Sequence, residues 1–151
     1  MSEYRIEKVR RSVTLVLRGG TSIGGEVFLQ PTARYRPGAQ EPDELFNEED
    51  PFVPLATTDD HHVLLAKDHI IQVHYSAGPA DTPVSGVSGA AVELVFADGT
   101  TCSGELRMET RASRSRLLDF LNEGHQRFLT LYSPGRVCLV NCRQIAQVRQ
   151  R

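Results

Sequence analysis

The chain has 151 residues, 40% of them hydrophobic and 24% charged, which is the composition of a soluble globular protein with one ordinary domain or two very small ones. No apolar run approaches the roughly 18 residues of a membrane-spanning helix, and the N-terminus lacks the apolar core of a signal peptide, so we expect a cytoplasmic protein with no membrane partner. The formal net charge of −2 argues against non-specific binding of nucleic acid by the chain as a whole.

Residues 13–29, VTLVLRGGTSIGGEVFL, predict two strands joined by a tight turn. Apolar and polar residues alternate on both sides of Gly19-Gly20, and this period of two is typical of half-buried strands. Glycine pairs accept the positive φ angles that a tight hairpin requires. Gly25, inside the second strand, predicts a sharp bend or a close approach of two backbones. The run has no lysine, which a phosphate-binding loop needs, so we predict no cofactor site here.

A long insert that is Pro-rich and acidic, residues 30–51, follows the second strand. Loops of this length in compact domains often carry a function. Short apolar runs at 52–55, 63–65 and 70–73 then predict three further strands, which makes five. The run Asp59-Asp60-His61-His62 between two of these strands holds residue types that bind metals. Because adjacent side chains on a turn rarely converge on one ion, we predict a polar turn and no metal site.

Residues 76–91 are rich in Gly, Ser, Pro and Ala, and they predict a linker. The chain then repeats itself, because residues 92–108 align with residues 13–29 without a gap. Further along the chain, the apolar positions of the two copies match again in the same order. We therefore predict a duplication with a first repeat at 1–75, the linker, and a second repeat at 92–151 that again holds five strands.

The second repeat also has an insert, residues 109–124, which is Arg-rich and ends in RLLDFLN, a sequence that predicts a short helical turn. The candidates for a binding site are the arginines in and beside this insert and one asparagine near its end: Arg107, Arg111, Arg114, Arg116 and Asn122. Arginine presents a planar fork of donors that suits phosphate and carboxylate, so these residues would suit RNA, a nucleotide or another anion. The alternative is a solvated loop, or one that pairs with the acidic insert of the first repeat.

The three cysteines, Cys102, Cys138 and Cys142, are too few and odd in number for a disulfide framework. All three lie in strand-like stretches, where cysteine behaves as a small hydrophobic residue. Cys138 and Cys142 are four residues apart on one predicted strand, which is too far for a disulfide or a shared metal ion. We therefore predict buried or half-buried structural thiols.

The stretches Val13–Val27 and Val92–Leu106 resemble the V-x-L-x-x-G-x-x-x-x-G-x-L stretch that opens the fold of the Sm-like family. Asp43–Asn47 is similar to the Asp-x-x-Met-Asn element of that family, and Asp119–Asn122 is similar with one residue fewer. The Arg-Gly pair that the family carries near its last strand is absent from both repeats. The resemblance implies an all-β fold of two tandem five-stranded Sm-like or SH3-like small barrels with short helical turns.

The resemblance also implies self-association, because Sm-like rings hold six or seven units, and three two-unit chains would form a pseudo-hexameric ring. It implies RNA as a partner as well. The charge distribution favours head-to-tail contact between chains. Residues 13–75 carry four basic side chains against ten acidic ones, a net charge of −6, and residues 92–151 carry nine arginines against six acidic residues, a net charge of +3.

The sequence holds no constellation that predicts catalysis. The run Ser85–Gly89, SGVSG, lies in the linker, and it lacks the strand and helix that position a nucleophilic serine. We therefore predict a non-enzymatic interaction or scaffold protein that needs no cofactor and no metal. The alternative function is RNA or nucleotide binding through the arginines of the second repeat.

Overall fold

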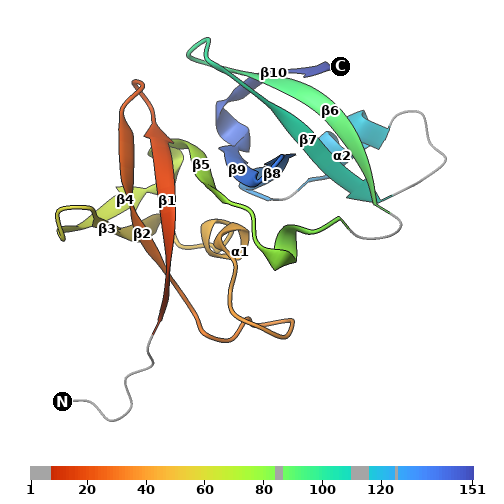
Figure 1. The fold of residues 1–151 in the computed structure, drawn as a ribbon. Coiled ribbons are helices and arrows are strands. Elements are labelled where there is room, and N and C mark those ends of the chain that lie inside the picture. The colour runs from red at the N-terminus through yellow and green to blue at the C-terminus, as the bar shows by residue number, and fades with distance from the viewer. Residues whose placement is uncertain (1–7, 84–86, 110–115, 125) are drawn as a thin grey trace.

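The computed structural model describes residues 8–83, 87–109, 116–124 and 126–151 (Figure 1). They form ten β-strands, two short α-helices and three 3-10 turns, so the predictions of an all-β fold and of short helical turns are confirmed. The elements follow one another as β1 (Val9–Leu17), β2 (Ser22–Leu29), α1 (Pro42–Phe46), β3 (Phe52–Thr57), β4 (His62–Ala66), η1 (Lys67–His69), β5 (Ile70–Ser76), η2 (Pro79–Asp81), β6 (Val87–Phe96), β7 (Thr101–Glu109), α2 (Arg116–Glu123), β8 (Phe128–Ser133), β9 (Arg136–Asn141), η3 (Cys142–Gln144) and β10 (Ile145–Gln150).

All ten strands belong to one antiparallel sheet in the order β10-β6-β7-β8-β9-β5-β1-β2-β3-β4. The first half (β1 to β5) and the second half (β6 to β10) repeat the same order, because the fifth strand lies beside the first and the others follow in sequence. The two halves are joined where β5 of the first half pairs with β9 of the second half (Figure 1). The sheet is continuous and stays open at β4 and β10, so the structure does not show the two separate barrels that the sequence predicts.

Both hairpins that the repeat predicts are present. Gly19 and Gly20 have φ angles of +90° and +88°, and Gly99 has +87°, a region that L side chains rarely adopt. Gly25 lies where β2 meets β3, and a Cβ atom there would come within 2.3 Å of the Ala56 carbonyl oxygen. The predicted close approach of two backbones at Gly25 is therefore confirmed.

The sheet bends around two hydrophobic cores. The first core lies in the first half, around Leu15, Val27, Leu55 and Val73. The second core lies in the second half, where the α2 side chains Leu117, Phe120 and Leu121 pack against the buried residues of β6 to β9. Ile71 of β5 lies in the second core, and side chains of β8 and β9 lie in the first core.

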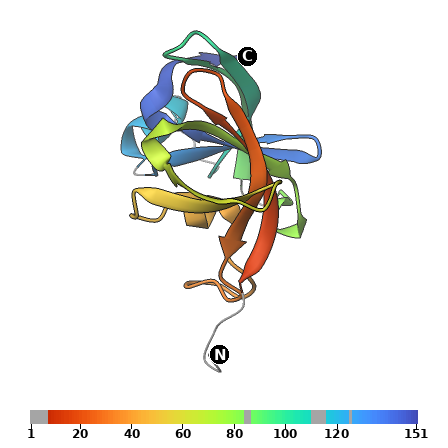
Figure 2. The same cartoon turned by 90° about the vertical axis from the view of Figure 1, so that its left-hand side faces the viewer.

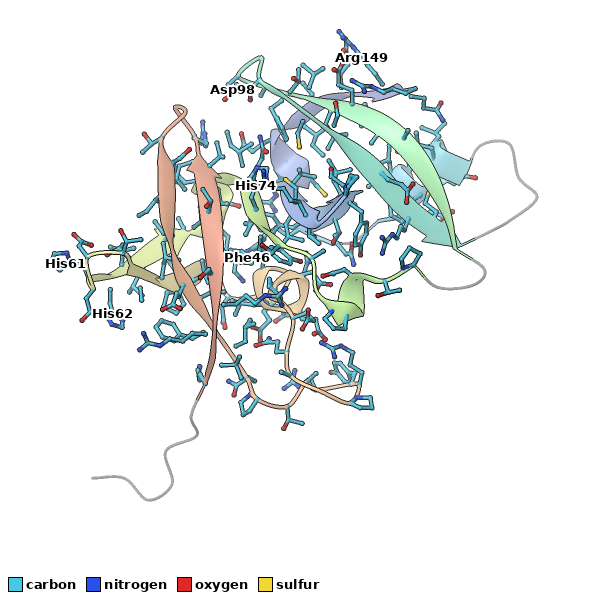
Figure 3. The ribbon with its side chains drawn as sticks, viewed as in Figure 1. Phe46, His61, His62, His74, Asp98 and Arg149 are labelled. Carbon is cyan, nitrogen blue, oxygen red and sulfur yellow. The ribbon has the colours of Figure 1, made fainter. Side chains whose placement is uncertain are left out.

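The segment between the repeats is shorter than the predicted linker. It contains η2 and ends where β6 begins at Val87, ahead of the predicted start of the second repeat at residue 92. Residues 84–86 lie outside the described part of the chain. Of the run Asp59–His62, the first three residues lie in the turn between β3 and β4, and His62 begins β4. His61 Nδ1 lies 3.0 Å from Asp59 Oδ2. Figure 3 places His61 and His62 at the outer tip of the first half.

Candidate functional site: the junction and the two open edges

The two halves meet where β5 pairs with β9. Val73 lies opposite Leu139 and His74 lies opposite Cys138 in this antiparallel register. The second half contributes Phe128, Val137 and Leu139 to the first core, and each of these side chains is fully buried. The junction therefore completes the first core with side chains from the other half. We refer to β5, β9 and these residues as the internal junction.

Helix α1 fixes the start of β8 at the internal junction. The Phe46 ring packs edge-on against the Phe128 ring, with centroids 5.6 Å apart and an interplanar angle of 69°. Asn47 follows the helix, and its side chain accepts a hydrogen bond from the Phe128 N–H at 2.8 Å and donates one to the Phe128 carbonyl at 3.3 Å. Asn47 therefore pairs with the backbone of the other half as a strand neighbour would. Figure 3 shows Phe46 between the two halves.

Two buried polar residues complete the junction. The Lys67 ammonium donates to the carbonyls of Glu48 (2.9 Å) and Leu45 (3.3 Å), and its burial lowers the pKa of this side chain. Asn141 donates to the carbonyls of Ile70 (2.9 Å) and Lys67 (3.3 Å). Both residues therefore satisfy backbone carbonyl groups that lie at the junction.

The outer edge of the first half is β4, and one apolar side chain of β4 and one of the neighbouring β3 are exposed there although their counterparts are buried. Phe52 corresponds to Phe128 in the repeat and Leu64 corresponds to Leu139. Phe52 is 56% exposed and Leu64 is 72% exposed, whereas both counterparts are fully buried. The difference arises because β9 has β5 beside it, whereas β4 pairs only with β3. Figure 2 views the molecule from the side on which β3 and β4 lie.

The outer edge of the second half is β10, the counterpart of β5. Ile70 and Val73 on β5 are fully buried, whereas the corresponding Ile145 and Val148 on β10 are only partly buried. A pocket of about 300 Å³ opens beside them, and its apolar lining includes Leu121, Leu129 and Ala146. Leu121 corresponds to Phe46, which packs against Phe128 at the internal junction. The pocket in the second half therefore occupies the place that corresponds to the site in the first half where the Phe128 side chain packs.

The structure describes only part of the predicted arginine site. Arg111 and Arg114 lie outside the described residues, and Arg116 is described only through its backbone at the start of α2. Arg107 lies on β7 with its guanidinium 3.5 Å from the centre of the Tyr132 ring, and it donates to the Asp81 carbonyl at 2.5 Å. Asn122 is exposed on α2, and no hydrogen bond joins it to Arg107.

Two arginines that the sequence analysis did not select lie near Arg107. Arg136 and Arg151 line the same open cavity of about 600 Å³ as Arg107, together with the acidic side chains of Asp81 and Glu105. Arg151 is held by Glu93 and Ser103 at 3.3 and 3.2 Å. They were missed because both lie outside the Arg-rich insert, and only the fold brings them to the cavity.

Within the described ranges, no three His, Cys, Asp or Glu side chains form a group that could hold a metal ion. No helix in that same part of the chain has the length and apolar character of a membrane-spanning segment. Comparison of the chain with protein-family models, with curated proteins and with solved structures finds no match.

Proposed function

We propose that this protein is a non-enzymatic scaffold that assembles head to tail, with the β4 edge of one chain pairing with the β10 edge of the next. One observation carries the proposal. The strands at the two open edges, β4 and β10, correspond in the repeat to β9 and β5, and these two pair at the internal junction. Each half of the chain is proposed to act as one barrel-like unit of the Sm-like kind.

The register of the internal junction predicts the register between chains. Leu139 faces Val73 at the junction, so Leu64 of one chain would face Val148 of the next. By the same correspondence Val63 would face Arg149. Each open edge carries a row of unpaired backbone N–H and C=O groups, and such edges are templates for pairing with another strand.

The apolar side chains at the two edges favour the same contact. Phe52 would enter the pocket beside Leu121, as Phe128 packs beside Phe46 at the internal junction. Leu64 would be covered by the β10 side chains Ile145 and Val148. Burial of one such side chain contributes about 1.5 to 3 kcal/mol, and the unlike net charges of the two halves would favour the approach.

A head-to-tail contact uses two different surfaces, so it produces a ring if the rotation closes and a filament if it does not. The Sm-like resemblance favours a ring of six repeats, which is three chains. The long acidic insert of each chain would then be a surface through which the assembly meets a protein partner.

Sedimentation velocity at micromolar protein tests the assembly. The proposal predicts a species of three times the chain mass of 16.8 kDa. The double variant Phe52→Asp/Leu64→Asp places two charges in the contact and is expected to sediment as a single chain. Tyr35→Asp is the matched control, because Tyr35 is also exposed but lies in the insert, away from both edges. A single-chain mass for the unmodified protein would contradict the proposal.

A second candidate function is binding of RNA or another anion through the second repeat. It is favoured by the cavity in which Arg107, Arg136 and Arg151 lie together. Phosphate contacts release counterions, so binding should weaken steeply between about 50 and 200 mM salt. Fluorescence anisotropy with labelled single-stranded RNA pools measures this dependence. Arg111→Glu/Arg114→Glu is expected to abolish the binding, and flat traces at micromolar protein would contradict this function.

A further inference from the structure

Two of the three cysteines lie in contact although they are far apart in sequence. Cys102 on β7 and Cys138 on β9 have their sulfur atoms 3.8 Å apart. A disulfide bond is about 2.05 Å long, so the two sulfur atoms are in van der Waals contact and one short movement from bond formation. Cys102 is half-buried and thus accessible to a small oxidant, whereas Cys138 is buried behind it.

Two polar side chains of β5, in the first half, lie beside the inner thiol, which belongs to the second half. The Cys138 sulfur lies 3.6 Å from Gln72 Oε1 and 3.7 Å from His74 Nε2, and these two residues also contact each other at 2.8 Å. In Figure 3 sulfur atoms lie beside His74. Burial lowers the pKa of His74, so at neutral pH its imidazole is neutral. In the neutral ring His74 Nε2 carries the hydrogen, because it donates to the amide oxygen of Gln72.

The two thiols differ in how readily they lose a proton. Contact with the Cys138 thiol lowers the pKa of Cys102, because the S–H group of Cys138 stabilises a thiolate there, and the Arg136 charge acts in the same direction. The pKa of Cys138 is raised by the same contact and by burial. The thiolate is the reactive form of cysteine, so the more accessible sulfur is also the better nucleophile.

We propose that Cys102 and Cys138 form a redox-active pair that closes to an intramolecular disulfide in the presence of a peroxide. The pair lies within one chain, so it does not depend on the assembly proposed above. The two cysteines are 36 residues apart in the sequence, and only the fold brings them together.

The reaction takes two steps. The Cys102 thiolate attacks one oxygen of hydrogen peroxide, the O–O bond breaks, and the products are a sulfenic acid at Cys102 and a hydroxide ion. The hydroxide takes up the proton that the Cys102 thiol released and becomes the first water. The Cys138 sulfur then attacks the Cys102 sulfur, the S–O bond breaks, and the oxygen leaves as a second water with the proton from Cys138. Two thiols lose two electrons and two protons, and one peroxide accepts them. A dithiol reductant reverses the change by thiol–disulfide exchange.

Cys142 is an internal control for this proposal. It lies in η3, and burial raises the pKa of its thiol, so it should react slowly. Within the described residues, no other sulfur atom lies in contact with the Cys142 sulfur. A merely general sensitivity to oxidation would affect all three thiols, whereas the proposed pair would leave this one reduced.

The test uses the full chain under native conditions with a small excess of hydrogen peroxide, followed by alkylation and intact mass analysis. The proposal predicts a product that retains one alkylatable thiol and is about 2 Da lighter before alkylation, and this product is reversed by dithiothreitol. Peptide mapping should find the link between Cys102 and Cys138. Cys142→Ser should react in the same way, and Cys102→Ser should form no disulfide within one chain.

Three results would overturn the proposal. One is oxidation of Cys102 to sulfinic or sulfonic acid without a link to Cys138. Another is a disulfide that uses Cys142 to the same extent. The last is the same mixture of links in native buffer as in concentrated urea, where the fold no longer selects the partner. Arg136→Gln is expected to slow the native reaction several-fold at neutral pH, and an unchanged rate in this variant would remove the assigned role of Arg136.

Discussion

Corresponding strands of the two repeats form the internal junction and the two open edges of the sheet. At the junction β5 and β9 pair with each other, whereas β4 and β10 each have no strand on their outer side. At the junction Phe128 and Leu139 are buried against β5 and α1 of the first half. At the edges Phe52 and Leu64 stand in place of Phe128 and Leu139, and β4 pairs only with β3. At the other edge β10 stands in place of β5 and pairs only with β6. Each repeat therefore carries both kinds of strand that the contact needs. Within one chain only β5 and β9 pair with each other, and β4 and β10 keep one side free.

The largest difference is expected between Phe128 and Phe52. Phe128→Ala removes a fully buried ring from the first core, and such a change costs about 3 to 5 kcal/mol of unfolding free energy. Phe52→Ala removes an exposed ring and should cost less than about 1 kcal/mol for a single chain. Urea unfolding followed by far-UV circular dichroism, at a concentration where single chains dominate, measures both. Equal losses would show that the two positions do not differ in burial.

A smaller difference is expected between two asparagines. Asn47→Ala leaves the Phe128 N–H and carbonyl without their partners across the junction, which should cost about 1 to 2 kcal/mol. Asn122→Ala changes the corresponding exposed residue of α2 and should stay within about 0.5 kcal/mol. The same urea titration compares them. A loss at Asn122 as large as that at Asn47 would mean that α2 contacts a partner under the conditions used.

The smallest effect concerns pH. His74 lies at the junction beside Gln72 and Cys138, and burial together with the Arg136 charge lowers its pKa below the ordinary value near 6.5. The unfolded chain therefore takes up this proton at a higher pH than the folded chain. The free energy of unfolding should fall as the pH drops below about 6.5, down to the pKa of the folded state.

His74→Gln should flatten that pH dependence between about pH 7 and 5. His69→Gln is the control, because His69 is exposed in η1 and does not lie at the junction. Thermal unfolding midpoints over this range measure the slope. A slope that His69→Gln removes and His74→Gln leaves unchanged would contradict the assignment to the junction.

Much of the architecture could be predicted from the sequence because alternation and glycine placement are local signals. The period of two around Gly19-Gly20 and Gly99 predicts the hairpins, and RLLDFLN predicts α2. The pairing of β5 with β9 could not be predicted in this way, because it joins strands from different repeats and depends on burial of side chains over long sequence distances. For the same reason the contact between Cys102 and Cys138 was not visible in the spacing of the cysteines.

The predicted binding residues show a similar limit. Arg107 was selected because it lies close to the Arg-rich insert, yet it packs on Tyr132 and binds the Asp81 carbonyl. Two further arginines line the same cavity: Arg136 at the start of β9, and Arg151 at the end of the chain. Composition identifies a basic segment, whereas the sheet decides which arginines meet.

The most direct test of the head-to-tail account is a cross-link between β4 of one chain and β10 of the next. A chain with its three cysteines replaced by serine would carry Val63→Cys and Arg149→Cys, which the register of His74 opposite Cys138 places face to face. The account predicts a covalent species of three chains under mild oxidation. The pair Val63→Cys and Val148→Cys, whose second side chain points to the other face of β10, should give little product. A product that stays at one chain at every micromolar concentration would contradict the account.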